Sequence, residues 1–320
     1  MLVLNAGNIE ALAPMTDVIE CLRRAFADGA VVPPRQVLST PGGAGDRLLL
    51  VMPAFDAAGG GVVKLSSVHP DNPAKGLPTF QGVVVVLDES GAARALLDGA
   101  AVTRRRTAAA SALASSLLSR PDSARLLILG TGSLAPLMAL AHCQVRPIRH
   151  IGVWGRRSER AEATADSIRA LADPGVEVHA VTALADVAAS ADIISCCTSS
   201  VTPVLAGEWL KRGSFVDLVG SYSPQRREAD DEVLQRCRIF VDTLEGALAE
   251  AGDLLDPMQR GIITRQCILG ELADLVRGQV EGRRDPGEMT LFKSVGSALE
   301  DLALCRLIVE RFAPAAIQPR

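Results

Sequence analysis

The stretch Leu126-Leu-Ile-Leu-Gly130-Thr131-Gly132-Ser133-Leu134-Ala135 decides the fold. Four apolar residues predict a buried strand, and the pattern that follows predicts a helix. Between them stands G-x-G-x-x-A, in which Gly130 permits a tight turn, Gly132 lets the backbone approach a pyrophosphate, and Ala135 allows close helix–sheet packing. A purely structural glycine turn is the alternative, but the flanking strand and helix favour a dinucleotide. We therefore assign to the dinucleotide site the residues Gly130, Thr131, Gly132, Ser133, Leu134 and Ala135.

The sequence downstream alternates strand and helix patterns, with helices predicted over 135–144 and 159–172. Such alternation indicates βαβ units with parallel strands. We therefore predict an α/β fold whose dinucleotide-binding domain, residues 121–291, holds a Rossmann-type doubly wound parallel sheet. The predicted strands are 125–130, 151–154, 176–181, 192–196, 214–219 and 239–242.

The residues before this domain have a different pattern. A helix is predicted around 16–27, and a second one over 98–119, which ends before Pro121. Short runs rich in Val and Leu at 47–52, 61–68 and 82–88 predict antiparallel strands. A long amphipathic helix is expected over 290–312, packing back on this part of the chain. We therefore predict a second, α+β domain formed by residues 1–120 and 292–320.

The tip of the second Rossmann strand indicates which dinucleotide binds. An NAD site usually has an Asp or Glu there, which hydrogen-bonds the ribose 2′-hydroxyl. Here the sequence Trp154-Gly155-Arg156-Arg157-Ser158 has no acid. Two guanidinium groups and a hydroxyl suit the 2′-phosphate of NADPH, although the arginines could also be the solvated start of the next helix. We expect NADPH, with NADH possible, and we assign Arg156, Arg157 and Ser158 to the cofactor site.

Composition excludes several other classes of protein. The net charge is −4 and there is no long basic run, so we expect neither nucleic acid nor a membrane surface as a partner. No apolar stretch approaches the roughly 20 residues of a membrane helix. The N-terminal residues lack a signal-peptide pattern. Seven scattered cysteines are expected to be small buried hydrophobes in a reducing cytoplasm. The four histidines show no metal-ligand spacing, so no metal is expected.

Further motifs, taken together and in order, make the chain resemble the ornithine cyclodeaminase/mu-crystallin family over essentially its whole length. In addition to Gly130-x-Gly132, the matching stretches are Val31-Val-Pro-Pro-Arg35, Val51-Met-Pro53, Lys64, Asp98-Gly99, Thr103-Arg-Arg-Arg106-Thr107-Ala108-Ala109 and Glu288-Met-Thr-Leu-Phe292-Lys293-Ser294-Val295-Gly296-x-Ala298-x-Glu300-Asp301.

The resemblance implies a homodimer that moves hydride between NAD(P) and the α-carbon of an amino or imino acid, with the α+β domain binding substrate and forming the dimer. It implies that Arg35, Lys64 and Arg106 hold the substrate carboxylate, with Thr107 beside them. Fixed cations suit a small anion, and arginine offers a planar fork that matches a carboxylate. On the same basis the cofactor site also includes Val219, Gly220 and Lys293.

One departure from the family points to the reaction. Cyclodeaminases carry an acid/base Asp in the loop after the 214–219 strand, where this sequence has Tyr222, and a pocket acid where it has Leu50. A phenol with its ordinary pKa near ~10 is a poor base at neutral pH. We therefore expect reduction of cyclic ketimine acids, Δ1-pyrroline-2-carboxylate to proline and Δ1-piperideine-2-carboxylate to pipecolate, as in the family's ketimine reductases.

The catalytic residues predicted for this reaction are Lys64, Arg106 and Tyr222. Either Lys64, Tyr222 or water would protonate the imine nitrogen. An amino-acid dehydrogenase of the alanine type, an ornithine cyclodeaminase and a non-enzymatic, crystallin-like NADP(H)-binding protein are the alternatives. Assignment of the substrate rests on the family resemblance more than on pocket chemistry.

Overall fold

The computed structural model describes residues 1–43 and 45–316, and it divides into two compact units. One unit consists of Met1–Thr107 and the chain from Ser297 onward, and the other is Ala108–Gly296. The division falls inside a continuous helix, α3 (Gly99–Leu118), whereas the sequence placed it after residue 120. The sequence has no turn residues at this boundary, because the two halves of one uninterrupted helix belong to different units.

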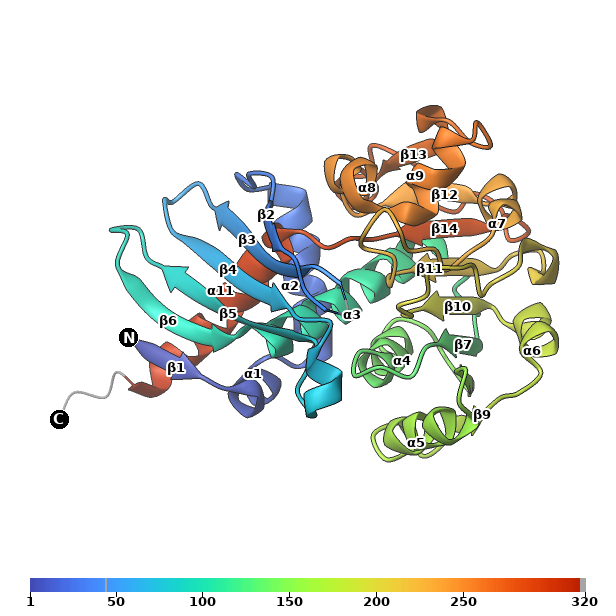
Figure 1. Cartoon of the computed structure of the whole chain (residues 1–320), viewed down its shortest axis with the longest axis horizontal. Coiled ribbons are helices and arrows are strands. Elements are labelled where there is room, and N and C mark those ends of the chain that lie inside the picture. The colour runs from blue at the N-terminus through green and yellow to red at the C-terminus, as the bar shows by residue number, and fades with distance from the viewer. Residues whose placement is uncertain (44, 317–320) are drawn as a thin grey trace. The chain divides into compact units, whose positions relative to one another are not determined.

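The N-terminal unit contains a six-stranded sheet with the order β1-β6-β5-β4-β3-β2 (Figure 1). Strands β2 to β6 pair antiparallel, as the sequence predicted for 47–52, 61–68 and 82–88, and β1 pairs parallel with β6. Helix α11 packs on β3, β4 and β5 and also contacts α2. The elements are β1 (Leu2–Leu4), α1 (Ala6–Leu12), α2 (Met15–Asp28), β2 (Gln36–Thr40), β3 (Arg47–Phe55), β4 (Gly61–Val68), the 3-10 helix η1 (Asn72–Lys75), β5 (Phe80–Leu87), β6 (Ala93–Asp98) and α11 (Ala298–Ala316).

The second unit contains an eight-stranded sheet with the order β13-β12-β14-β11-β10-β7-β8-β9. All its strand pairs are parallel, which confirms the predicted class of sheet. The chain runs outward from β7 through β8 to β9 and then returns to β10 on the other side of β7. This reversal of strand order is the point at which such sheets bind dinucleotides.

The elements of the second unit alternate along the chain. They are β7 (Arg125–Leu129), α4 (Ala135–Cys143), β8 (His150–Trp154), α5 (Ser158–Arg169), β9 (Glu177–Ala180), α6 (Leu184–Ser190), β10 (Ile193–Cys196), η2 (Gly207–Trp209), β11 (Phe215–Leu218), α7 (Asp231–Arg236), β12 (Arg238–Val241), α8 (Leu244–Glu250), α9 (Gly252–Gln259), η3 (Arg265–Cys267), β13 (Ile268–Glu271), α10 (Leu272–Val276) and β14 (Thr290–Lys293).

The predicted helix over 290–312 is wrong in its first part. Residues Thr290–Lys293 form β14, a fully buried strand between β11 and β12. Gly296 has φ of 84°, in the left-handed region that a helix excludes, and α11 begins only at Ala298. In sequence, a short buried strand that leads into a helix has the same apolar pattern as one longer helix, so the two cannot be distinguished.

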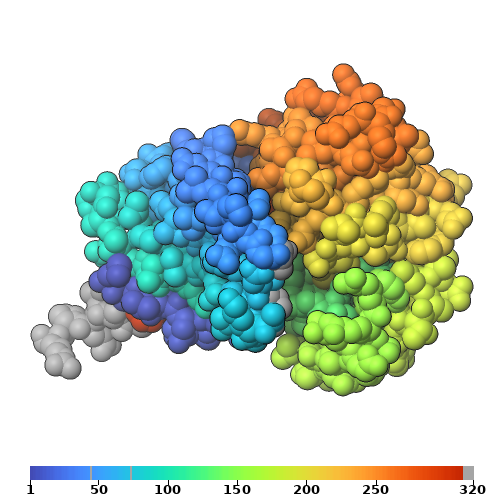
Figure 2. Space-filling view, in the orientation of Figure 1, coloured from blue at the N-terminus to red at the C-terminus, as the bar shows by residue number. Residues whose placement is uncertain are grey.

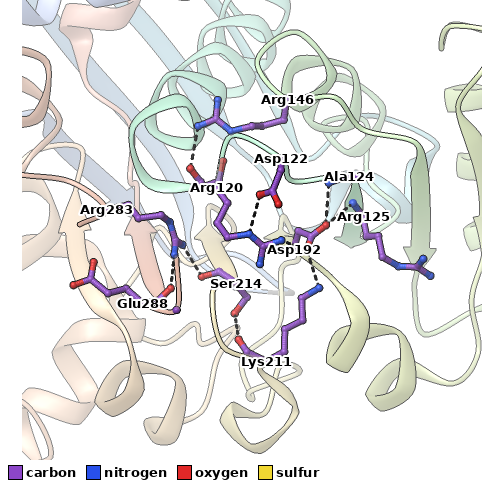
Figure 3. Close-up of polar contacts among 12 residues, drawn as sticks. Arg120, Asp122, Ala124, Arg125, Arg146, Asp192, Lys211, Ser214, Arg283 and Glu288 are labelled. Atoms are coloured by element: carbon purple, nitrogen blue, oxygen red, sulfur yellow. Dashed lines mark hydrogen bonds and ion pairs between the residues drawn. The ribbon is translucent and has the colours of Figure 1, made fainter. Parts of the chain in front are cut away.

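Charged side chains fix the amino-terminal edge of this sheet (Figure 3). Asp192, just before β10, accepts hydrogen bonds from the backbone N–H groups of Ala124 and Arg125, both at 2.9 Å. It also pairs with Lys211 at 2.7 Å and Arg120 at 3.0 Å. The carboxylate thus joins the starts of β7 and β10 and satisfies two backbone donors there.

Within 1–43 and 45–316, no helix is both long and apolar enough to cross a membrane. In the same residues no group of His, Cys, Asp and Glu side chains is arranged to hold a metal ion.

Candidate active site

The turn between β7 and α4 has the geometry that the glycine motif predicts. Gly130 has φ of 131°, and a Cβ there would lie 2.8 Å from the carbonyl oxygen of Cys197. Its N–H donates to the carbonyl of Trp154 at 2.9 Å. A side chain at this position would therefore strain the backbone and push apart the ends of two neighbouring strands.

The space beyond this turn fits a pyrophosphate. A Cβ on Gly132 would meet nothing within 4 Å, so the backbone is open to a ligand there. Ala135 is fully buried, as close packing of α4 on the sheet requires. Helix α4 starts with no side-chain cap. Its first turn therefore lacks a side-chain acceptor from the capping residue Leu134, as at helix starts that bind phosphate.

The second strand tip lies against the same turn. A Cβ on Gly155 would come within 2.5 Å of Cγ2 of Thr131, so the two turns are in close contact. Arg156, Arg157 and Ser158 follow directly and are exposed. The light-green segment that includes α5 forms part of the surface in Figure 2. The arginines are thus beside the pyrophosphate turn and accessible to a ligand.

The loops after β10 and β11 are held together by one buried carboxylate. Glu228 Oε1 accepts hydrogen bonds from Thr198 N at 2.6 Å and Thr198 Oγ1 at 2.9 Å. Its Oε2 accepts from Gly220 N at 2.5 Å. A Cβ on Gly220 would lie 1.8 Å from the carbonyl oxygen of Thr198. Only glycine fits where these two loops meet, and Val219 before it is also buried.

Glu228 belongs to a buried group of three charges. Asp253 and Lys293 have no exposed surface, and Lys293 Nζ lies 3.2 Å from Asp253 Oδ2. Burial and the charge of Asp253 raise the pKa of Glu228, whereas Lys293 and the backbone N–H groups of Thr198 and Gly220 lower it. Lys293, predicted to bind cofactor, thus has its ammonium beside these carboxylates.

Tyr222 follows this loop and is 43% exposed. The guanidinium carbon of Arg226 lies 4.9 Å from the centre of its ring. The phenol therefore has a cation beside it on the surface of the dinucleotide-binding unit.

In the N-terminal unit, two of the predicted substrate cations meet at a pair of carboxylates. Lys64 Nζ on β4 lies 2.6 Å from Asp301 Oδ2. Arg106 on α3 places Nε 3.1 Å from Asp301 Oδ1 and Nη1 2.8 Å from Glu300 Oε2. All four side chains are buried. The two carboxylates on α11 therefore fix the orientation of both cations.

Arg35 is close enough to this cluster to act on Lys64 electrostatically. Burial lowers the pKa of Lys64 to about 8; Asp301 opposes that effect, and the charges of Arg106 and Arg35 add to it. Thr107, the next residue of α3, is also buried. Arg106 and Arg35 thus both add positive charge near Lys64.

Sequence reasoning had assigned no role to Glu300, Asp301, Glu228 or Asp253. A signal for the first two exists, because adjacent acids in the apolar run Leu299-Glu300-Asp301-Leu302 are unexpected on a buried helix face. Glu228 lies among other charged residues, where nothing local distinguishes it, and Asp253 is a single acid at the start of a helix, a common surface position.

A parallel sheet with a glycine motif at its switch point, joined to an α+β unit that holds buried cations, is the architecture of a two-domain dinucleotide-binding enzyme. The ornithine cyclodeaminase/mu-crystallin family model matches residues 2–315. The chain belongs to the ornithine cyclodeaminase/mu-crystallin family and is an enzyme of the oxidoreductase class.

Three comparisons place it within the family. It is 36% identical to a Delta(1)-pyrroline-2-carboxylate reductase of Paracoccus denitrificans, over 97% of this chain and 96% of the relative. The Thermococcus litoralis Delta(1)-pyrroline-2-carboxylate reductase, solved with NADH and L-proline, is 33% identical with a TM-score of 0.94 and complete coverage of both chains, 100% and 100%. An archaeal alanine dehydrogenase dimer with bound NAD is 26% identical, with a TM-score of 0.90 over 99% of this chain and 97% of that one.

Proposed function

We propose that the chain reduces cyclic ketimine acids, Δ1-pyrroline-2-carboxylate to L-proline and Δ1-piperideine-2-carboxylate to L-pipecolate, with a nicotinamide dinucleotide as hydride donor. The observation that carries this proposal is the buried group Lys64, Arg106, Glu300 and Asp301 with Arg35 nearby. The relatives named as Delta(1)-pyrroline-2-carboxylate reductases support the choice of substrate.

The cation cluster recognises the substrate carboxylate. Its three cations, Arg35, Lys64 and Arg106, attract an anion, and Arg106 is already held in one plane by bonds from Nε and Nη1. A cation fixed in this way loses little freedom when it binds, so more of the interaction appears as affinity. Arg35 and Thr107 complete the set of substrate-binding residues in this proposal.

The proton for the imine nitrogen comes from Lys64 in this proposal. Its pKa of about 8 allows the ammonium to be the main form at neutral pH and still release its proton readily. Bound reduced nicotinamide supplies the hydride. Arg106 contributes by orienting the substrate, because positioning alone removes much of the barrier to such a transfer. Tyr222, the other predicted proton donor, is tested below.

Arg156, Arg157 and Ser158 favour NADPH over NADH in this proposal. They are exposed beside Thr131, and no acid stands at the tip of β8 to bind a free 2′-hydroxyl. The solved relatives carry NADH or NAD, so both coenzymes belong in every assay.

A second copy of this chain covers the outer face of the six-stranded sheet in this proposal. Strand residues alternate between faces, and the face opposite α11 carries the apolar, partly exposed Val51, Leu65 and Val83 at its centre, beside the polar Arg47, Ser67 and Gln81. Leu65 on β4 is 36% exposed and is paired in register with Val51 and Val83. An exposed apolar patch of this kind is typical of an interface. The archaeal relative is described as a dimer.

The cell compartment proposed is the cytoplasm. All seven cysteines are free thiols in the described structure. Reducing compartments maintain that state.

The test is oxidation of NADPH and NADH by the purified protein with a panel of cyclic imino acids, open-chain 2-oxo acids plus ammonia, and ornithine. We expect turnover with Δ1-pyrroline-2-carboxylate and Δ1-piperideine-2-carboxylate. Turnover confined to pyruvate plus ammonia would identify an alanine dehydrogenase. Ammonia released from ornithine would identify a cyclodeaminase, and binding of coenzyme without any turnover would identify a crystallin-like protein.

A further inference from the structure

Glu228 occupies an unusual position for a buried carboxylate. Both of its oxygens accept hydrogen bonds, one from Thr198 in the loop after β10 and one from Gly220 in the loop after β11. The side chain has no exposed surface. A single carboxylate therefore ties together two loops at the carboxyl edge of the parallel sheet.

A second layer fixes the carboxylate in turn. Asp253 Oδ1 accepts from the backbone N–H groups of Glu228 at 2.7 Å and Ala229 at 3.2 Å. Its other oxygen faces Lys293 Nζ at 3.2 Å, and Lys293 is the last residue of β14. Ser221 Oγ, in the loop after β11, accepts from the N–H of Asp253 at 3.3 Å. Glu228, Asp253 and Lys293 thus connect loops that follow three neighbouring strands.

These loops lie in one half of the dinucleotide fold. The strand order reverses between β7 and β10, and each half of such a sheet binds one mononucleotide. The glycine motif after β7 and the arginines after β8 mark the adenosine half. The loops after β10 and β11 therefore belong to the half that receives the nicotinamide nucleotide.

We propose that Glu228, supported by Asp253 and Lys293, is a positioning residue that holds the loops after β10 and β11 in the conformation that binds the nicotinamide half of the coenzyme. This inference rests on the dinucleotide site of the proposed function. In this inference Glu228 and Lys293 act through the loops, and Lys293 supports Asp253 in place of the direct coenzyme contact expected from the sequence.

The variant Glu228→Gln distinguishes this positioning role from a general contribution to stability. A carboxylate accepts at two oxygens, whereas a carboxamide accepts at one and donates at the other. Either Thr198 or Gly220 would then have its N–H facing an NH₂ group, and one loop would move. The adenosine half, which Glu228 does not contact, would keep its geometry.

The experiment measures dissociation constants of NADPH and NADH alongside adenosine 2′,5′-bisphosphate and AMP, which lack the whole nicotinamide nucleotide. With Glu228→Gln we expect the dissociation constants of the whole coenzymes to rise about tenfold, as for loss of one hydrogen bond to a charged group. The constants of the fragments should stay within about twofold of the parent values.

Asp192→Asn is the matched control, because Asp192 is also buried and also accepts from two backbone N–H groups, but at the opposite edge of the same sheet. It should lower the melting temperature and leave the ratio of coenzyme to fragment affinity unchanged. Lys293→Met gives a second variant, expected to change that ratio in the same direction as Glu228→Gln.

The inference would be overturned if Glu228→Gln raised the dissociation constants of coenzyme and fragment equally, or left both at their parental values. If Glu228→Gln does not fold, the same two outcomes in Lys293→Met overturn it. Failure of the parent protein to bind either ligand would instead contradict the dinucleotide site itself.

Discussion

Replacing Arg106 by alanine removes the guanidinium at the centre of the substrate cluster. The side chain is 5% exposed and bonds both Glu300 and Asp301, so its removal takes a paired cation from both buried carboxylates. The cluster would lose one of its positive charges. Truncating one member of a buried charge pair typically costs about 2–5 kcal/mol. For a substrate carboxylate this corresponds to a fall in kcat/KM of roughly 30-fold to several thousand-fold.

The assay is steady-state reduction of Δ1-pyrroline-2-carboxylate, with the melting temperature and coenzyme affinity measured on the same protein. Coenzyme affinity should barely change, and Arg106→Lys should restore activity only in part, because an ammonium lacks the fork geometry. Arg105→Ala is the control: Arg105 donates to the carbonyl of Ala13, so we expect slightly lower stability and parental kinetics. Full activity in Arg106→Ala, or a crippled Arg105→Ala, would refute the assignment.

Four other variants test the remaining assignments. Replacing Arg156 and Arg157 by alanine should raise KM for NADPH much more than for NADH; equal losses would exclude 2′-phosphate recognition. The kcat/KM for imine reduction should fall as pH rises through about 8, where Lys64 loses its proton. In Lys64→Arg this fall should disappear from the pH profile, since arginine stays charged. Leu65→Glu should yield monomers in light scattering, since the dimer would bury a charge; an unchanged dimer would contradict that interface. Tyr222→Phe should keep kcat within about tenfold of the parent, because Lys64 supplies the proton in the proposal; a larger fall, typical of the loss of a general acid, would make Tyr222 the donor.

The parts of the fold that were predicted correctly from the sequence are those determined by residues close to one another along the chain. The β7–α4 turn was predicted in detail because Gly130, Gly132 and Ala135 meet their constraints within one motif. Residues 290–293 were wrongly assigned to a helix because β14 is stabilised by β11 and β12, strands distant in sequence. No local pattern carries that information.

The same distinction applies to the candidate site. Arg35, Lys64 and Arg106 were found through the family resemblance, and their nearness is now visible in the charges that act on Lys64. The carboxylates that orient them could not be placed, since Asp301 meets Lys64 only when α11 packs on β4. Glu228 was missed for a similar reason: its partners are backbone N–H groups of two other loops, which leave no mark on the sequence.

Transfer of deuterium tests the central claim most directly. The purified protein is incubated with Δ1-pyrroline-2-carboxylate and NADPH deuterated at C4 of the nicotinamide, with each stereoisomer used in turn, and the product is examined by mass spectrometry and proton NMR. We predict L-proline that carries one deuterium at its α-carbon with one of the two stereoisomers and none with the other. Proline without deuterium from either isomer, or no proline at all, would contradict hydride transfer to the C=N carbon.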